Sequence, residues 1–376
     1  MYRLTAPCLF GLEKTLSFEI KRAGGTNIAM RDGRAFFDGG ENVIAKMNIT
    51  SSVAERVQIV LGEFKASDFD AIFEGAKSAP IEEFAGSEDA FPVAKGHSLN
   101  SKITSIPAVQ RTVKKALAER MKNKYGTELP ESKHTLPVHF LLQKDVMLLT
   151  LDTTGASLHK RGYRSRSGEA PIRETLAAGM ADLAHVRSSD LICDPFCGSG
   201  TILIEAAMKQ LNIAPGMNRA FIASEWDCFH KDIWEREFRE AGERVKNDNI
   251  TLFGCDKDGE AVKLAEENAW KAGVNKYIRF ERRDIKDFRY PETSVKIITN
   301  PPYAQRMLTE EEADGIYRVM GERMLPLGKN SLYVITSRES FPELFGKKAD
   351  KDRKLYNGML KCRLYSYFGE RPEKIR

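Results

Sequence analysis

Apolar positions in the second half of the chain fall into short runs that each end in a polar or glycine-rich turn. The runs 191–193, 250–255, 277–280 and 295–299 are short and bounded by turn signals, which is typical of buried strands. Between the first two runs, the apolar residues 202–207 predict a helix. This succession of strand, turn and helix indicates an α/β fold with a largely parallel sheet.

Two further apolar segments close the chain. The run 331–336 predicts another strand, and the segment 353–368 predicts two strands joined at Asn357-Gly358. An Asn-Gly step favours a type I′ turn, because both residues tolerate a positive φ. We therefore expect the sheet to end in an antiparallel hairpin.

The chain ahead of residue 156 has a mixed pattern of short helices and strands. Residues 12–23 predict a helix closed by Gly24-Gly25, and residues 107–125 predict a longer helix with one apolar and one basic face. The other expected elements are strands near 28–30, 34–37, 91–95, 137–142 and 146–152, with helices from about 41 and near 68–77. The pattern predicts two small α+β modules, 1–65 and 66–155, followed by the α/β domain at 156–376.

A polar residue stands at the end of each of the first four strands expected in the α/β domain: Asp194, Asp256, Asp284 and Asn300. Each acid by itself could be an ordinary helix cap, but four strand ends in this order favour a binding site. Gly198-Ser199-Gly200 follows the first acid, and a loop of this kind brings backbone N–H groups close to a ligand. A dinucleotide fingerprint would need glycine at Leu203, so a smaller ligand with a carboxylate and an ammonium fits better. Asp194 would be the counter-charge to that ammonium, Asp256 would bind ribose hydroxyls, and Asp284 would accept from an adenine amino group.

Asn300-Pro301-Pro302-Tyr303 directly follows the expected strand 295–299. The Asn300 side-chain oxygen can accept a hydrogen bond from an exocyclic NH2, and a Pro-Pro step fixes the backbone so that the Pro301 carbonyl can accept another. Tyr303 would stack on the base. The same four residues could also be an ordinary strand-exit turn, so the strand-end acids decide between the two interpretations.

Together these motifs resemble those of the class I S-adenosylmethionine-dependent methyltransferases that act on exocyclic amino nitrogens. The resemblance implies S-adenosyl-L-methionine as cofactor and a Rossmann-like class I methyltransferase sheet with a C-terminal antiparallel hairpin. It assigns the methionine part of the cofactor to the loop 194–201 and the chemistry to the Asn-Pro-Pro-Tyr motif. The cofactor-binding residues so implied are Asp194, Phe196, Gly198, Gly200, Thr201, Asp256, Asp284 and Asn300, and the catalytic residues are Asn300, Pro301 and Tyr303.

The segments 158–164 and 169–178 narrow the resemblance. They are similar to the entry into the catalytic domain of the THUMP-containing RNA guanine-N2 methyltransferases, in particular the bacterial 23S rRNA enzymes. The resemblance implies a ferredoxin-like region at 1–65, a THUMP region at 66–155, and a helix after Pro171 that closes one side of the cofactor pocket. Pro171 is thereby also implied as a cofactor-binding residue. Alternatively, Pro171 marks only the start of that helix.

The net charge of +5 is concentrated in two segments. Residues 102–124 hold seven Lys or Arg against Glu119 alone, and residues 157–166 hold four with no acid, beside a potential stacking ring at Tyr163. The first segment could be only a solvated helix face, but two basic segments beside a base-modifying site favour an RNA phosphate track. The RNA-binding residues so expected are Lys114, Lys115, Lys122, Lys124, Lys160, Arg161 and Arg164.

Composition agrees with this interpretation. The 376 residues, 42% of them hydrophobic, can form two or three domains with cores of their own. The sequence has neither a run of about 18 apolar residues nor a signal-peptide pattern, and its six cysteines form no Cys-x-x-Cys pair. We therefore expect a reduced, cytoplasmic setting and no membrane partner. The six histidines show no metal-ligand spacing, so no metal is expected.

The resulting hypothesis is methylation of the exocyclic N2 of a guanine in structured RNA, with 23S rRNA as the first expectation. The alternatives are a tRNA guanine-N2 methyltransferase, an adenine-N6 methyltransferase and, from a different class, a non-catalytic RNA-binding or assembly protein. No obligate protein partner is indicated. The segment 212–249, with Trp226 and Trp234, is assigned no chemistry.

Overall fold

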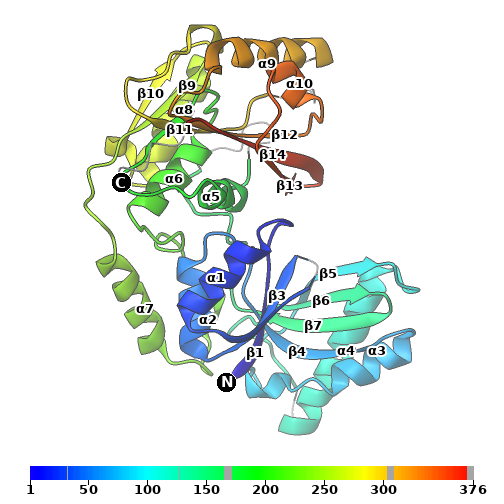
Figure 1. Cartoon of the computed structure of the whole chain (residues 1–376). Helices are drawn as coiled ribbons and strands as arrows, with labels where there is room; N and C mark the ends of the chain where they lie inside the picture. The colour runs from blue at the N-terminus through cyan, green and yellow to red at the C-terminus, as the bar shows by residue number, and fades with distance from the viewer. Residues whose placement is uncertain (32, 127, 165–171, 303–308, 371–376) are drawn as a thin grey trace. The chain divides into compact units, whose positions relative to one another are not determined.

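The computed structural model describes residues 1–376 apart from 32, 127, 165–171, 303–308 and 371–376 (Figure 1). Its contacts group the described chain into two compact units. Unit 1 comprises Met1–Cys8, Leu16–Leu158 and Arg219–Glu240, and unit 2 comprises Leu9–Thr15, His159–Asn218 and Ala241–Arg376. The segment 219–240, which lies within 212–249, thus belongs with the N-terminal part of the chain. The module boundaries 1–65, 66–155 and 156–376 remain predictions.

Unit 1 contains a seven-stranded sheet in the order β2-β3-β1-β4-β7-β6-β5. Strand β4 pairs antiparallel with both β1 and β7, so it joins an N-terminal group of strands to a second group. The strands are β1 (Tyr2–Pro7), β2 (Thr26–Arg31), β3 (Arg34–Gly39), β4 (Gln58–Lys65), β5 (Val93–Leu99), β6 (Val138–Gln143) and β7 (Val146–Asp152). The helices that accompany them are α1 (Glu13–Ala23), α2 (Glu41–Thr50), α3 (Phe69–Lys77), α4 (Ile106–Tyr125) and α7 (Lys231–Glu243), with a 3-10 turn η1 (Ile81–Glu83).

Helix α4 has the amphipathic character predicted for 107–125. It carries Pro107 near its start, where a missing N–H costs nothing, and ends at Gly126 with φ +66°. The apolar positions 109, 113, 116, 117 and 121 are all buried. Helix α4 packs against α3 and β5, so the apolar stripe forms part of the core of unit 1.

Unit 2 contains the second seven-stranded sheet, in the order β10-β9-β8-β11-β12-β14-β13. Strands β10, β9, β8, β11 and β12 are mutually parallel, and β14 pairs antiparallel with β12 and β13. The strands are β8 (Leu191–Asp194), β9 (Leu252–Asp256), β10 (Ile278–Arg282), β11 (Val295–Thr299), β12 (Ser331–Thr336), β13 (Lys351–Asn357) and β14 (Leu360–Phe368). The predicted Rossmann-like sheet with a C-terminal antiparallel hairpin is confirmed.

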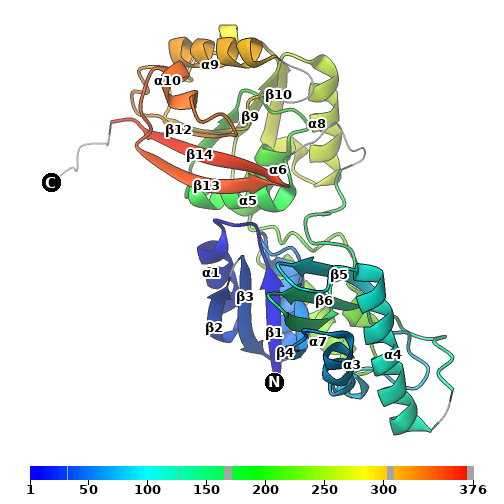
Figure 2. The ribbon, with the colours of Figure 1, turned by 90° about the vertical axis from the view of Figure 1, so that its right-hand side faces the viewer.

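Helices cover both faces of this sheet, as Figures 1 and 2 show. One face carries α5 (Glu174–Leu183), α6 (Thr201–Gln210) and α8 (Gly259–Lys271), and the other carries α9 (Glu310–Met324) and α10 (Phe341–Phe345). Three 3-10 turns lie between elements of unit 2 or in the segment 219–240: η2 (Ile222–Glu225), η3 (Asn275–Tyr277) and η4 (Ile285–Asp287). In the described chain, no helix combines the length and the apolar character needed to span a membrane.

The C-terminal hairpin lies where the sequence predicted it, but the predicted turn type is wrong. Asn357 pairs with Leu360, so the two loop residues are Gly358 and Met359. Gly358 has φ +64°, while neither Asn357 nor Met359 has a positive φ. A type I′ loop needs positive φ at both central residues. Because the register places Asn357 in the strand, its tolerance for positive φ is not used.

Candidate active site

Four polar residues lie along one edge of the sheet of unit 2. Asp194 and Asp256 are the last residues of β8 and β9, and Asn300 directly follows β11. Asp284 lies two residues beyond the end of β10. Because these four strands are adjacent and parallel, their carboxyl ends share one edge, where open α/β sheets bind their ligands. The structure therefore brings together the four strand-end residues expected from the sequence.

A glycine loop connects β8 to α6 at this edge. Gly198 and Gly200 have φ +51° and +78°, a region that other residues rarely adopt. A Cβ added at Gly198 would meet nothing within 4 Å, so this turn leaves open space beside the backbone. Gly200 precedes α6, whose first residue is the buried Thr201. Free N–H groups at a helix start, next to open space, suit the carboxylate of a small ligand.

Close packing of α6 against β9 replaces the missing third glycine of the dinucleotide fingerprint. Leu203 occupies that position on α6, and Gly254 faces it from β9: a Cβ added at Gly254 would lie 2.7 Å from the Leu203 side chain. In the fingerprint, a glycine on the helix allows helix and strand to pack closely. Here the glycine is on the strand, at Gly254, and it leaves room for the Leu203 side chain of the helix. The sequence reasoning did not identify Gly254, although a glycine inside a strand signals a close approach.

Asp256 is hydrogen-bonded to the backbone of the glycine loop. Its Oδ2 accepts a hydrogen bond from the Gly198 N–H at 3.0 Å, and its Oδ1 accepts from the Asp258 N–H at 3.0 Å. Asp284 accepts from the Lys286 N–H at 2.9 Å and caps η4. Both carboxylates are only partly buried, so each keeps acceptor capacity toward the sheet edge. Their predicted contacts with ribose and adenine remain predictions.

Asp194 is fully enclosed. Its Oδ1 accepts from the Phe196 N–H at 3.1 Å and from the Thr299 hydroxyl at 2.6 Å. Burial raises the pKa of Asp194 to about 7, against the lowering effect of those two hydrogen bonds. Ionising this carboxyl group in a buried environment costs free energy, and a nearby cation would stabilise the ionised form. This is the counter-charge role predicted for Asp194.

The Asn300 side chain presents an unpaired acceptor. Its Oδ1 is buried and has no hydrogen-bond partner among the described residues. Leaving a buried acceptor unpaired costs about 1–3 kcal/mol, which a donor on a bound ligand would offset. This atom is the one predicted to accept from an exocyclic NH2.

A hydrogen bond from helix α9 fixes the backbone after Asn300. Tyr317, a fully buried residue of α9, donates to the Pro302 carbonyl at 3.2 Å and contacts the Thr336 hydroxyl at 2.9 Å. Pro301 is itself buried. Neither Thr299 nor Tyr317 was identified from the sequence: Thr299 could have been noted as the neighbour of Asn300, but Tyr317 lies in a helix with no motif around it.

The RNA-binding prediction for Arg161 is wrong, whereas that for the partly exposed Arg164 remains a prediction. Arg161 is 3% exposed and its guanidinium lies 3.5 Å from both Glu205 carboxylate oxygens. Arg164 lies 3.4 Å from the Glu174 carboxylate and donates to the Thr201 hydroxyl at 2.9 Å. Both arginines neutralise buried acids of α5 and α6, because a buried carboxylate needs a partner charge. Counting charges along the segment could not reveal these distant acids.

Tyr163 is likewise buried and is not available as a stacking ring. Its hydroxyl donates to Glu205 Oε1 at 2.9 Å. Lys160 is exposed, and its predicted RNA contact remains a prediction. Pro171 and Tyr303 lie outside the described residues.

Acids from elsewhere in unit 1 also neutralise part of the basic face of α4. Lys114 pairs with Glu131, and Lys122 lies 3.4 Å from Glu128. Lys115 and Lys124 are exposed and have no ion pair among the described residues. The local charge excess is therefore smaller than the sequence count, and Lys115 and Lys124 are the stronger RNA-binding candidates.

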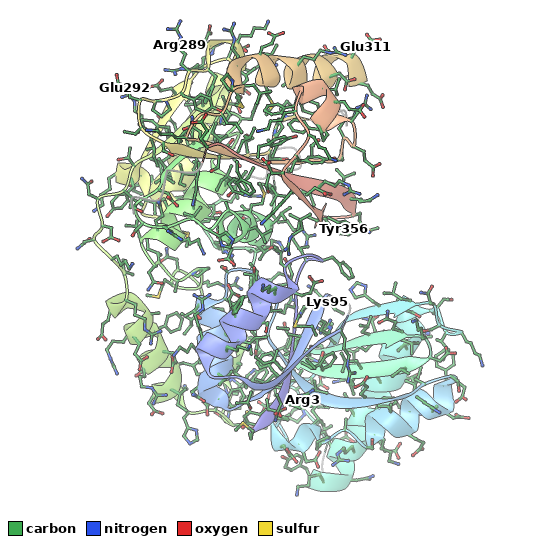
Figure 3. All side chains as sticks on the ribbon, viewed as in Figure 1. Arg3, Lys95, Arg289, Glu292, Glu311 and Tyr356 are labelled. Carbon is green, nitrogen blue, oxygen red and sulfur yellow. The ribbon has the colours of Figure 1, made fainter. Side chains whose placement is uncertain are left out.

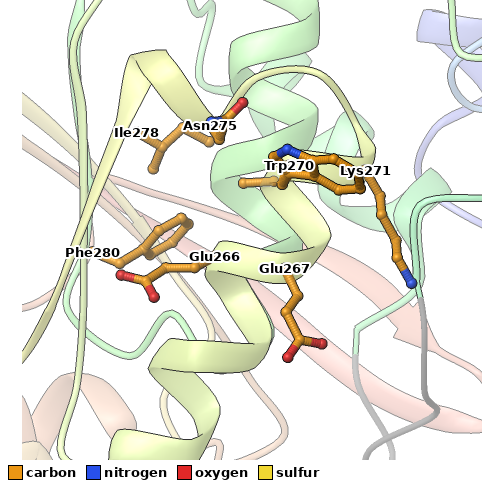
Figure 4. A pocket seen from close by; sticks show the side chains of 8 residues that line it. Glu266, Glu267, Trp270, Lys271, Asn275, Ile278 and Phe280 are labelled. Atoms are coloured by element: carbon orange, nitrogen blue, oxygen red, sulfur yellow. The ribbon is translucent and has the colours of Figure 1, made fainter.

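A hollow of about 620 Å³ lies away from this site (Figure 4). It is formed by the C-terminal half of α8, η3 and the start of β10, whereas the four strand-end residues lie at the opposite ends of the strands. Its lining residues are Glu266, Glu267, Ala269, Trp270, Lys271, Asn275, Ile278 and Phe280. None of these is a predicted site residue.

Three protein-family models match successive parts of the chain. The model for an RlmL ferredoxin-like domain matches residues 3–58, the THUMP domain model matches 66–152, and the model described as "RMKL-like, methyltransferase domain" matches 161–366.

Individual relatives agree with the family matches. The "Putative RNA methyltransferase YpsC" of Bacillus subtilis (strain 168) is 38% identical, with 99% of this chain and 98% of the relative covered. A "Ribosomal RNA large subunit methyltransferase K/L" from Syntrophotalea carbinolica is 30% identical over 95% of this chain, which spans only 52% of that relative. Among solved structures, "SMU.472, a putative methyltransferase complexed with SAH" superposes with a TM-score of 0.94, at 36% identity and 99% coverage of both chains.

Proposed function

The chain belongs to the family of RMKL-like methyltransferases, and from that premise we propose that it methylates the exocyclic N2 of a guanine in structured RNA, with 23S rRNA as the substrate. The family match covers more than half of the chain. A THUMP domain match and relatives named as RNA methyltransferases support RNA as the substrate class. The choice of guanine N2 as the methylated atom and of 23S rRNA as the RNA goes beyond that substrate class and is proposed here.

S-adenosyl-L-methionine supplies an electrophilic methyl group when it is bound. The site fits this cofactor, because the open turn at Gly198 and the start of α6 suit its carboxylate, and the buried Asp194 suits its ammonium. Asp256 and Asp284 would hold the ribose and the adenine. Phe196, Gly200 and Thr201 complete the loop, and Pro171 is proposed to border the pocket.

The unpaired Oδ1 of Asn300 is the observation that carries the proposed chemistry. It would accept a hydrogen bond from the target amine and, together with the Pro301 carbonyl, orient the nitrogen lone pair toward the methyl group. Tyr303 would stack on the base. No strong general base is needed, since the nitrogen can lose its proton after it has attacked. The target base would have to leave its stack to reach these residues.

Nucleoside analysis after in vitro methylation tests the proposal. The purified chain is incubated with S-adenosylmethionine and either unmodified 23S rRNA or unmodified tRNA, both transcribed in vitro, and the digested RNA is analysed by mass spectrometry. N2-methylguanosine from 23S rRNA is expected. The same nucleoside from tRNA alone, or N6-methyladenosine, would replace the proposal with one of the two alternatives within the same chemistry. Cofactor binding without methylation of either RNA would favour a non-catalytic scaffold.

A further inference from the structure

The β13–β14 hairpin extends beyond the rest of the sheet at the catalytic edge. Thr336, the last residue of β12, pairs with Arg363 of β14, so residues 360–362 continue past the end of β12. At about 3.4 Å per residue, this places the tip, Gly358 and Met359, roughly 10 Å farther out. Because β12 runs parallel to β11 and β8, the hairpin tip lies on the edge that also carries Asp194 and Asn300.

Aromatic and apolar side chains gather at this hairpin. The Tyr356 ring, labelled in Figure 3, lies 5.8 Å from the Phe10 ring, and Phe10 is 50% exposed. Met359 at the tip is fully exposed. Lys354 Nζ lies 5.2 Å from the centre of the Tyr356 ring. Rings accessible to solvent and topped by a cation are typical of surfaces that bind single-stranded nucleic acid.

The position of Phe10 is fixed by the segment that carries it. The Gly11 carbonyl accepts a hydrogen bond from Arg353 at 2.9 Å. A Cβ added at Gly11 would lie 2.6 Å from the Lys354 carbonyl oxygen, so only glycine allows these two segments to approach so closely. The Phe10 ring is therefore held beside Tyr356 as part of a preformed surface.

The surface is also basic. Residues 353–363, which form the end of the hairpin near its tip, contain four Lys or Arg and no acid. Asp352 pairs with Arg363, and Glu339 pairs with Lys361. Lys354 makes no ion pair with any carboxylate in the described part of the chain. A cation without a counter-ion next to stacking rings favours a polyanion with bases, rather than a neutral or basic protein surface.

We propose that Phe10, Lys354, Tyr356 and Met359, here called the hairpin patch, bind the single-stranded RNA that flanks the target base. This inference rests on the proposed function, because it assigns to the hairpin patch the same RNA that Asn300 modifies. Lys354 contacts a phosphate, and an unstacked base packs against Tyr356 and Phe10. The hairpin patch would thereby hold the strand at the edge where the target base enters.

A second lysine–tyrosine pair in unit 2 provides a matched control. Lys276 Nζ lies 4.7 Å from the Tyr277 ring centre, but this pair is in η3, before the amino end of β10 and away from the catalytic edge. Lys354→Gln and Tyr356→Ala are compared with Lys276→Gln and Tyr277→Ala. The affinity of each full-length variant for unmodified 23S rRNA is measured by filter binding over a range of KCl concentrations.

Lys354→Gln should weaken RNA binding and lower the slope of log affinity against log salt by about 0.7, the effect of losing one phosphate contact to a single strand. Tyr356→Ala should weaken binding about tenfold through the loss of stacking. The two control variants should bind as the wild type does. If Lys354→Gln and Tyr356→Ala also bound like the wild type, or if both pairs of variants weakened binding equally, the inference would be overturned. Failure of the proposed chemistry gives a different result. The same RNA would then contain no methylated guanosine, while the hairpin variants would still bind it more weakly than the control variants.

Discussion

Thr299 donates a 2.6 Å hydrogen bond to Asp194, and this bond joins the ends of two neighbouring strands. Asp194 ends β8 at the glycine loop, and Thr299 ends β11 directly before Asn300. The same carboxylate oxygen also accepts from the Phe196 N–H. One buried acid therefore fixes both the loop proposed to bind the cofactor and the start of the proposed catalytic motif.

Cofactor affinity should depend on pH through Asp194. Its pKa of about 7 lies above the value of about 3.9 expected in the unfolded chain, so ionisation lowers folding stability as pH rises from about 4 to about 7. A bound ammonium favours the ionised carboxylate. Affinity for S-adenosylmethionine should therefore increase between about pH 6 and pH 8, and binding below about pH 7 should release a proton. Calorimetry in buffers of different ionisation enthalpy measures both effects.

Asp194→Asn is the control for this pH effect. It should bind the cofactor more weakly, with an affinity that no longer changes over the same pH range. A wild-type affinity that is independent of pH would contradict the counter-charge role.

Asp256 and Asp258 should respond differently to replacement by alanine. Asp256→Ala should weaken S-adenosylmethionine binding by about 1.5–3 kcal/mol, the scale for hydrogen bonds to a charged acceptor. Asp258 caps α8 by accepting from the Glu260 N–H. Asp258→Ala should lower the free energy of unfolding by about 1 kcal/mol and leave cofactor affinity unchanged. Calorimetry and denaturant titration separate the two outcomes, and equal cofactor affinities for all three proteins would remove Asp256 from the site.

Tyr317 should act as a positioning residue for the turn after Asn300. Tyr317→Phe removes the hydroxyl that bonds to Pro302 but keeps the ring that packs 5.0 Å from Phe341. We expect kcat for RNA methylation to fall about tenfold, while the KM for S-adenosylmethionine stays the same. Steady-state kinetics on the methylated RNA measure both constants.

Tyr367→Phe is the matched control for Tyr317→Phe. Tyr367 lies in the same apolar cluster, and its buried hydroxyl has no partner among the described residues. Its removal should leave kcat unchanged and should not destabilise the fold. Equal kcat values for the two variants would show that the Tyr317 hydroxyl does not position the turn.

Exposed and paired cations of α4 should differ in their effect on RNA binding. Lys115→Gln and Lys124→Gln together should lower RNA affinity and flatten its salt dependence. Each substitution removes a lysine that has no ion pair among the described residues and is therefore available to an RNA phosphate. Arg120 forms a bidentate pair with Glu82, at 2.6 and 2.5 Å. Arg120→Gln should instead reduce thermal stability. An unchanged salt slope for the double variant would leave this helix face a solvated surface without an RNA role.

The sequence was sufficient for features that depend on local pattern. Apolar runs located β8, β9, β11 and β12, and the residues that follow parallel strands necessarily share one edge. Leu203 correctly indicated that the loop departs from a dinucleotide fingerprint. The compensating Gly254 comes from another strand, so only the folded chain shows the two residues in contact.

Features that depend on distant partners could not be predicted. Arg161 and Arg164 looked like a basic surface because Glu205 and Glu174 lie far along the chain. Lys114 looked free because Glu131 follows the helix in a separate segment. In each case, a charge expected at the surface is neutralised by an acid that folding brings to it.

Asn300→Ala tests the central claim most directly. The variant should still bind S-adenosylmethionine and 23S rRNA, while its rate constant for methyl transfer falls about 100-fold or more, because the lost acceptor acts chiefly when the amine attacks. Single-turnover methylation of unmodified 23S rRNA, with both ligands saturating, measures that rate without a contribution from binding. A rate constant equal to that of the wild type would contradict the assignment of catalysis to Asn300.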